Sequence, residues 1–222
     1  MGQLYLVRHG QASFGADNYD QLSPLGQQQS LRLGQYWQAL GLKFDAVLTG
    51  TLQRHAQTWQ GIAQGAGFTH TPLIWPGLNE YDSEAVIAAI HPQPLAKART
   101  PEEVRAHFRL LRQGLRSWMQ GEVQPRGMPP HAEFVQGVQS ALDHVRQNYE
   151  GDVLLVSSGG PIATAVAQVL GLSSDVTIEL NLHIRNSSVS TFNYNPKRHT
   201  LLTYNTLPHL NEAEHSGMIT YA

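Results

Sequence analysis

The start of the chain brings together two side chains that could act on a phosphoryl group. Residues 3–7 form an apolar run with the composition of a strand, and Arg8, His9 and Gly10 follow it directly. In an open α/β sheet, ligands bind beyond the carboxyl ends of the strands. A guanidinium there can bind an anion through its fork of donors, and an imidazole can act as a nucleophile. This strand end therefore predicts chemistry on an oxyanion such as a phosphoryl group.

Two further predicted strands end in polar or glycine-rich turns that lead into helices. One comprises residues 44–48 with the turn 49–51, and the other comprises residues 153–156 with the turn 157–160. Helix N-termini carry free backbone N–H groups, so three such ends side by side would form an anion site. Arg54 lies one turn into the second helix, and we expect its guanidinium to reach the same edge of the sheet.

The elements that must position these groups alternate between strand and helix, which is typical of an α/β sheet. Ser23 and Pro24 have the residue types of an N-cap and a first helical position, and Thr100, Pro101 and Glu103 form a capping-box pattern. The predicted strands are residues 3–7, 44–48, 73–75 and 153–156, with a hairpin at 188–194 and 201–204. The predicted helices are residues 24–40, 52–64, 101–118, 132–149 and 162–170.

The chain shows no internal repeat and no change of composition that would mark a second domain. We therefore predict a single domain over residues 1–222, with a helical insertion over the sheet at about residues 83–150. The net charge of −2 is not typical of a nucleic-acid-binding protein, so no nucleic acid is expected as a partner. The sequence has no apolar run of membrane-spanning length and no secretory signal, so we expect a cytoplasmic protein without a membrane partner. The oligomeric state is left open.

The content of cysteine and histidine bears on metal chemistry. The chain has no cysteine, which excludes disulfides, thiolate catalysis and zinc sites built from cysteine. Its eleven histidines form no HExxH pattern and no compact cluster of ligands. We therefore expect neither a metal site nor a cofactor.

Five blocks, in order along the chain, resemble those of the histidine phosphatase superfamily, which includes the cofactor-dependent phosphoglycerate mutases. The blocks are LVRHGQ (residues 6–11), LSPLGQQQ (22–29), VLTGTLQRHAQT (47–58), LNE (78–80) and VSSGGPI (156–162). The resemblance covers nearly the whole chain and is weakest over the predicted insertion. It implies a phosphoglycerate mutase-like fold: a three-layer α/β/α sandwich with a mostly parallel central sheet. It also implies a small phosphorylated substrate or inorganic phosphate as the ligand.

The same resemblance implies a role for each site residue. His9 would be the nucleophile that accepts the phosphoryl group, and Arg8 and Arg54 would bind its oxygens. Glu80 would protonate the leaving oxygen and then activate water, with Asp82 as the alternative acid. For attack, the reacting nitrogen of His9 must be unprotonated, so its other nitrogen should donate to a fixed acceptor. Further substrate-binding residues are expected at Gly10, Gln11, Ser158, Gly159 and His55.

One position departs from the pattern of the superfamily. Its last block normally has a second histidine, and this chain has Ser158 there. A serine hydroxyl can still donate a hydrogen bond, but it is shorter than an imidazole and uncharged. His55 is a candidate to supply the missing imidazole, because the spacing of Thr51, Arg54 and His55 predicts one shared helix face. The alternative is that His55 only packs beside the first helix.

Three functions fit these residues. The favoured one is a metal-independent phosphatase that hydrolyses a phosphomonoester through a phosphohistidine intermediate. The second is a phosphoglycerate mutase; against it, residues 12–21 contain no lysine or arginine and lack the Trp-Asn pair that mutases carry after the signature. The third is a weakly active or non-catalytic phosphate-binding module, which the presence of Ser158 suggests.

Overall fold

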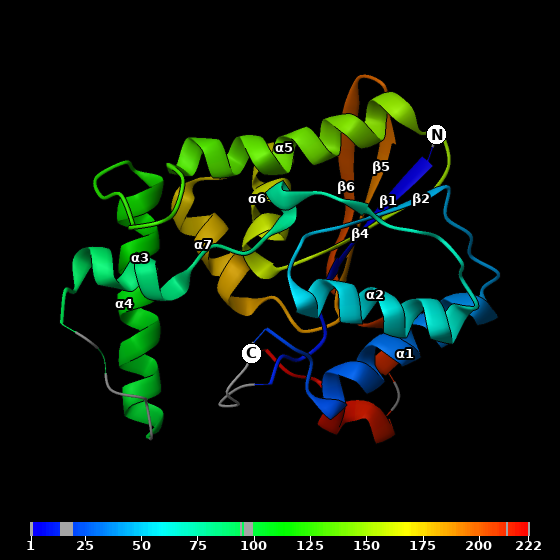
Figure 1. Ribbon diagram of the computed structural model, residues 1–222, viewed down its shortest axis with the longest axis horizontal. Coiled ribbons are helices and arrows are strands. Elements are labelled where there is room, and N and C mark those ends of the chain that lie inside the picture. The colour runs from blue at the N-terminus through cyan, green and yellow to red at the C-terminus, as the bar shows by residue number, and fades with distance from the viewer. Residues whose placement is uncertain (1, 14–19, 94, 96–99, 212, 222) are drawn as a thin grey trace.

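One central sheet organises the molecule, with helices on both of its faces (Figure 1). The computed structural model describes residues 2–13, 20–93, 95, 100–211 and 213–221. Within these residues the sheet has six strands in the order β3-β2-β4-β1-β5-β6. The strands are β1 (Gly2–Arg8), β2 (Ala46–Thr49), β3 (Leu73–Ile74), β4 (Val153–Ser157), β5 (Val189–Asn195) and β6 (Arg198–Thr206).

The strands β3, β2, β4 and β1 are parallel, and β5 and β6 add an antiparallel edge beside β1. The register of β1 and β4 pairs Leu4 with Val153 and Arg8 with Ser157, so the two strands end at the same level. The connection from β1 to β2 passes over β4, and a crevice for ligands forms at such a change of direction. The prediction of a mostly parallel sheet in an α/β fold is confirmed.

Two helical layers cover the sheet. α1 (Pro24–Ala39) and α2 (Gln53–Ala66) lie on one face, and α5 (His131–Asn148) and α6 (Gly159–Leu170) lie on the other (Figure 1). Successive strand residues point to opposite faces, so each strand supplies both layers. Leu6 packs towards α5 and α6, whereas its neighbour Val7 packs towards α1 and α2. Apolar side chains therefore fix both layers to the strands that carry the site.

Three more helices form a separate apolar cluster to one side of the sheet (Figure 1). They are α3 (Ser83–Ile90), α4 (Pro101–Met119) and α7 (Ser174–His183). Val86, Leu115 and Ile178 are buried where these helices meet. The prediction that residues 83–150 are an insertion in a single domain stays a prediction.

The capping signals in the sequence are confirmed. The Ser23 hydroxyl accepts a hydrogen bond from Gly26 N at the start of α1, and Thr100 and Glu103 form the reciprocal capping box of α4. The prediction that α6 starts at residue 162 is wrong, because it starts at Gly159. Glycine is required in this first turn for another reason: a Cβ on Gly160 would lie 2.2 Å from Glu80 Oε1.

One further prediction about a helix is wrong. Thr51 precedes α2 and binds the side chain of Asn79 through its backbone N–H and its hydroxyl, so it does not share a helix face with His55. The helices α3 and α7 were not predicted as separate elements. Short 3-10 helices occur at Pro76–Leu78, Pro208–Leu210 and Ala213–Met218. In the described part of the chain, no helix combines the length and apolarity that a membrane span requires.

Candidate active site

The turns that follow β1, β2 and β4 lie side by side at one edge of the sheet. His9 N donates to Ser157 O over 2.9 Å, and Gly50 N donates to Val156 O over 3.4 Å. The parallel register continues through these contacts and brings Ser158 alongside His9. Three segments that are far apart in the sequence thus form one continuous edge.

The geometry of His9 determines which of its nitrogens carries the proton. Its Nδ1 lies 2.7 Å from Gly10 O, and its Nε2 lies 3.3 Å from Arg54 Nε. A carbonyl oxygen only accepts and a guanidinium N–H only donates, so Nδ1 must be protonated and Nε2 must hold the lone pair. The fixed acceptor that the sequence left unidentified is therefore the carbonyl of Gly10.

The surroundings of His9 keep its imidazole neutral. The residue is only 4% exposed. Burial, followed by the positive charges of Arg8 and Arg54, holds the pKa of His9 well below its usual value. The hydrogen bond to Gly10 O opposes this shift without reversing it. At neutral pH, Nε2 of His9 is consequently a free base next to a guanidinium.

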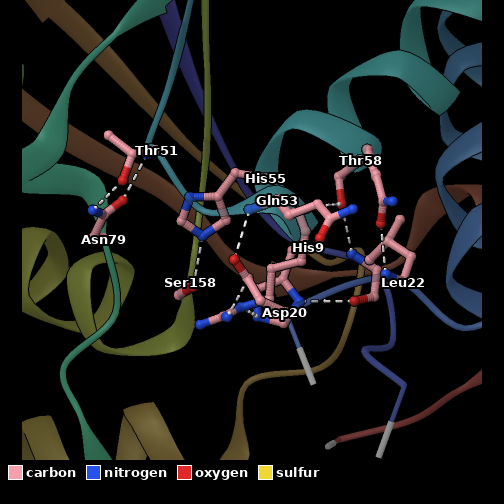
Figure 2. Close-up of polar contacts among 12 residues, drawn as sticks. His9, Asp20, Leu22, Thr51, Gln53, His55, Thr58, Asn79 and Ser158 are labelled. Carbon is pink, nitrogen blue, oxygen red and sulfur yellow. Dashed lines mark hydrogen bonds and ion pairs between the residues drawn. The ribbon is translucent and has the colours of Figure 1, made fainter. Parts of the chain in front are cut away.

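The guanidinium of Arg54 connects His9 to an acidic side chain. Arg54 Nη1 lies 2.7 Å from Asp20 Oδ1, and the other carboxylate oxygen of Asp20 accepts from Gln53 N over 2.9 Å (Figure 2). The Asp20 carboxylate thus binds both an arginine and the N-terminus of α2, where an anion is favoured. This arrangement holds Arg54 Nε towards His9.

The other arginine, Arg8, is held by backbone carbonyls from distant parts of the chain. Its Nη1 donates to Ile184 O over 2.5 Å and to Tyr221 O over 2.6 Å. Because Arg8 is the last residue of β1, its charge is fixed next to His9. Two guanidinium groups therefore contribute positive potential to the same imidazole.

Glu80 lies on the segment that precedes α3, close to the first turn of α6. Its two carboxylate oxygens accept from Gly160 N at 3.1 and 3.2 Å, and Oε1 also accepts from Tyr81 N. Burial raises the pKa of Glu80, although the Gly160 N–H and the charges of Arg54 and Arg8 act in the opposite direction. A raised pKa favours the protonated carboxyl, which is the form that can donate a proton.

The alternative acid, Asp82, has a structural contact instead. Its Oδ1 accepts from the backbone N–H groups of Glu84 and Ala85, which makes it the N-cap of α3. Glu80, in contrast, is influenced by the charges of both Arg8 and Arg54. The geometry therefore favours Glu80 over Asp82 as the acid.

His55 and Ser158 form a buried pair next to His9. His55 Nε2 lies 2.7 Å from Ser158 Oγ, and both residues are completely buried (Figure 2). The rings of His55 and His9 are 5.9 Å apart between centroids. Burial, together with the charge of Arg54, lowers the pKa of His55 to about 3, so His55 is neutral at physiological pH.

The remaining predicted binding residues differ in what they contact. Gly10 N donates to Thr58 Oγ1 over 3.0 Å, and a Cβ at Gly10 would lie 2.4 Å from Gly26 O, so glycine is required there. The side chain of Gln11 accepts from the Ser23 hydroxyl and is thereby committed to the start of α1. Gly159 is the first residue of α6 and follows Ser158 directly.

Some residues at the site were not predicted. Thr58 links Gly10 N to Arg54 O. Asp20 was noted only as part of a loop without basic residues. The spacing of Thr58, four residues after Arg54 on α2, could have identified it. Asp20 carries no such signal, because only the folded chain brings it to the site. The likeness to the superfamily does suggest Asn186 or Ser187 near the pocket, and Ser187 N donates to His9 O over 3.1 Å.

Potential metal ligands do not gather at this edge. Across the ranges that the structure describes, no three histidine, aspartate or glutamate side chains are grouped so that they could hold a metal ion. The positive charge beside His9 comes from Arg8 and Arg54.

Comparison with known protein families agrees with this geometry. The sequence profile of the histidine phosphatase superfamily (branch 1) matches residues 4–207. The chain belongs to this superfamily. Since the match covers nearly the whole chain, the resemblance of the five sequence blocks is confirmed, and the chain is an enzyme of the histidine phosphatase and phosphoglycerate mutase-like kind.

Two relatives illustrate the similarity at the level of sequence. A probable phosphoglycerate mutase, GpmB, from Cronobacter sakazakii is 30% identical over 206 residues, which cover 87% of this chain and 86% of the relative. A 2,3-bisphosphoglycerate-dependent phosphoglycerate mutase from Bartonella quintana is 36% identical over 86 residues, which cover 36% of this chain and 42% of the relative.

Several solved structures share the fold at low sequence identity. Phosphoserine phosphatase from Entamoeba histolytica in complex with 3-phosphoglyceric acid superposes with a TM-score of 0.66 at 22% identity, over 95% of this chain and 100% of that chain. YhfR from Bacillus stearothermophilus gives a TM-score of 0.68 at 18% identity, over 94% and 99% of the two chains. These superpositions support the phosphoglycerate mutase-like fold.

Proposed function

We propose that this chain is a phosphatase that hydrolyses a small phosphomonoester through a phosphohistidine at His9, without a metal ion. One observation carries the proposal: the lone pair of His9 Nε2 faces Arg54 Nε at 3.3 Å while Nδ1 is held by Gly10 O. A neutral nitrogen nucleophile next to a guanidinium suits attack on a phosphoryl group, because catalysis of this reaction depends mainly on positioning and electrostatic stabilisation. Phosphatases among the structural neighbours share the fold.

In the first step, the lone pair of His9 Nε2 attacks the phosphorus, and the bond between phosphorus and the ester oxygen breaks. Glu80 gives its proton to the leaving oxygen, so the alcohol departs neutral and the carboxylate remains. The side chains of Arg8 and Arg54 bind the phosphoryl oxygens and offset their negative charge. Burial, which raises the pKa of Glu80, keeps the proton available for this step.

In the second step, water attacks the phosphorus and the bond between phosphorus and His9 Nε2 breaks. The Glu80 carboxylate takes a proton from the water, which restores the acid for the next cycle. Inorganic phosphate leaves, and His9 returns to the neutral form with its proton on Nδ1. Two moderate displacements thus replace one difficult displacement by water.

The test is phosphorylation of the protein by a generic aryl phosphate, measured as acid-labile, alkali-stable protein phosphate after rapid quenching. We expect stoichiometric labelling of the wild type in the presence of a chelator, and no labelling of His9→Ala. His183→Ala is the matched control, because His183 is an exposed histidine at the end of α7. Unchanged labelling of His9→Ala, or labelling that requires a divalent cation, would contradict the proposal.

The second candidate is a phosphoglycerate mutase, which the similarity to probable GpmB enzymes favours. A mutase must bind a substrate that carries a carboxylate besides its phosphate. Here the Asp20 carboxylate pairs with Arg54, which adds negative charge at the site. An assay with 3-phosphoglycerate and a bisphosphate primer separates the two activities. Release of phosphate with little isomerisation supports the phosphatase, and efficient isomerisation supports the mutase.

A further inference from the structure

The pair formed by His55 and Ser158 occupies the position where the superfamily normally has one histidine. Ser158 Oγ and His55 Nε2 are 2.7 Å apart, so an imidazole at residue 158 would collide with the ring of His55. The imidazole at this place therefore comes from α2 rather than from the turn after β4. A Cβ at Gly50 would lie 2.4 Å from His55 Nδ1, so the glycine at residue 50 makes room for this ring.

The tautomer of His55 follows from its surroundings. Its Nδ1 is buried and has no hydrogen-bond partner among the described residues. Burying an N–H group without an acceptor is rarer and less tolerated than burying an unpaired acceptor. The proton of the neutral ring therefore belongs on Nε2, and His55 Nε2–H donates to Ser158 Oγ.

This tautomer leaves the hydroxyl proton of Ser158 available for another acceptor. Within the described residues, the hydrogen bond to His55 is the one that Ser158 Oγ makes. The parallel pairing of β1 with β4, extended by the bond from His9 N to Ser157 O, brings Ser158 next to the nucleophile. Its hydroxyl can thus donate towards a group bound at His9.

On the basis of the proposed function, we propose that His55 and Ser158 together replace the second histidine as a two-residue donor. In the transition state, Ser158 Oγ–H donates to a non-bridging oxygen of the phosphoryl group, and His55 Nε2–H donates to Ser158 Oγ. Ser158 is the catalytic residue of the pair. His55 is a positioning residue, which fixes the direction of the hydroxyl and polarises it through a chain of hydrogen bonds.

The test measures the rate of phosphoenzyme formation from an aryl phosphate by rapid quenching, and substrate affinity separately. Loss of one donor to a developing oxyanion typically lowers a rate about 100- to 1,000-fold. We expect Ser158→Ala to lower the phosphorylation rate about 100-fold, with less than about a threefold change in affinity. Ser158→Cys, which keeps the size but is a weak donor, should behave like Ser158→Ala.

His55 is tested by its dependence on Ser158. We expect His55→Ala to lower the rate about tenfold in the wild type, and less than about twofold in Ser158→Ala, because the role of His55 requires the hydroxyl. The double variant, which combines His55→Ala with Ser158→His, should form the phosphoenzyme at least about tenfold faster than Ser158→Ala. Ser158→His alone should stay impaired, since His55 occupies the space. Such a recovery cannot result from misfolding.

The outcomes distinguish this inference from the proposed function. If the wild type forms no phosphoenzyme at His9, the proposed function fails. If the wild type forms it and Ser158→Ala forms it equally fast, the inference alone fails. The inference also fails if His55→Ala lowers the phosphorylation rate by the same factor in the wild type and in Ser158→Ala. It fails likewise if the double variant forms the phosphoenzyme no faster than Ser158→Ala. Thermal unfolding of each variant confirms that the compared proteins are folded.

Discussion

Replacing Glu80 by glutamine should separate the two steps that the proposed mechanism assigns to this side chain. The amide oxygen of Glu80→Gln can still accept the hydrogen bond from Gly160 N, so the local geometry should persist. The variant removes the transferable proton and, after the first step, the base that activates water. We therefore expect a strong effect on alkyl esters, whose leaving oxygen needs a proton, and a weak effect on aryl esters during phosphorylation.

The size of the effect follows from the contribution of general acid catalysis, which is about 100- to 10,000-fold. This range corresponds to roughly 3–5 kcal/mol in the activation free energy. For an alkyl phosphate, we expect Glu80→Gln to lower kcat/KM about 100- to 10,000-fold. For an aryl phosphate, phosphoenzyme formation should fall less than about tenfold, while its hydrolysis should fall about 100-fold or more. The phosphoenzyme should consequently accumulate, with a burst of one phenol per site.

The assay combines rapid quenching of labelled protein with burst kinetics and a pH profile. Because burial raises the pKa of Glu80, the wild type should keep its protonated acid towards neutral pH and lose kcat/KM for alkyl esters as pH rises through that pKa. Glu80→Gln should lack this alkaline decrease. Asp82→Asn is the control, since asparagine also caps helices and should leave the ratio of alkyl to aryl activity unchanged. Equal losses for both esters in Glu80→Gln, without accumulation of phosphoenzyme, would refute the reasoning.

Three further predictions concern residues around the site. Asp20→Asn should tighten the binding of inorganic phosphate about 1.4- to fivefold by calorimetry, because a partly exposed ion pair with Arg54 is worth about 0.2–1 kcal/mol. Gly160→Ala should lower kcat about 100-fold or more, because its Cβ would lie 2.2 Å from Glu80 Oε1 and displace the acid. His209→Gln should reduce the decrease in unfolding free energy at acid pH, measured by chemical denaturation. Burial lowers the pKa of His209 to about 3, so below the unfolded-state pKa of about 6.5 its unfolded form binds one extra proton, which costs about 1.4 kcal/mol per pH unit.

Each of these predictions has a result that contradicts it. Weaker phosphate binding by Asp20→Asn would mean that the carboxylate positions Arg54 more than it competes with the ligand. Full activity of Gly160→Ala would mean that Glu80 is not the acid or that its segment shifts freely. An unchanged dependence of unfolding free energy on pH between about 6 and 4 in His209→Gln would mean that His209 titrates normally in the folded protein.

The sequence predicted the sheet and its site-bearing turns because these features are local. An apolar strand such as 153–156 is recognisable by its composition, and the cap at Ser23 is recognisable by its residue types. The helix α7 was missed because its apolar residues Val176, Ile178, Leu180 and Leu182 alternate like those of a strand. Its packing against α4 and α6 overrides that local pattern.

The limits of the site prediction have a similar cause. Residue types identified His9 and both arginines, whereas the acceptor for His9 Nδ1 is a backbone carbonyl, which every residue carries. The contact between His55 and Ser158 joins residues 103 positions apart, and no local pattern encodes its distance. Residue types could therefore suggest a partner for Ser158, but only the folded chain shows how the two side chains meet.

The hydrogen bond from Arg8 to the carbonyl of Tyr221 ties the orientation of this guanidinium to a distant segment. It joins residues separated by 213 positions, and a neighbouring residue, Thr220, binds Asn186 and Gln29 in the same region. The same nitrogen of Arg8 also donates to Ile184 O, so segments from two distant parts of the chain orient one side chain of the site. A change that displaces residues 220–221 would therefore act on the direction of Arg8, whereas His9 would keep the contact of its Nδ1 with Gly10 O.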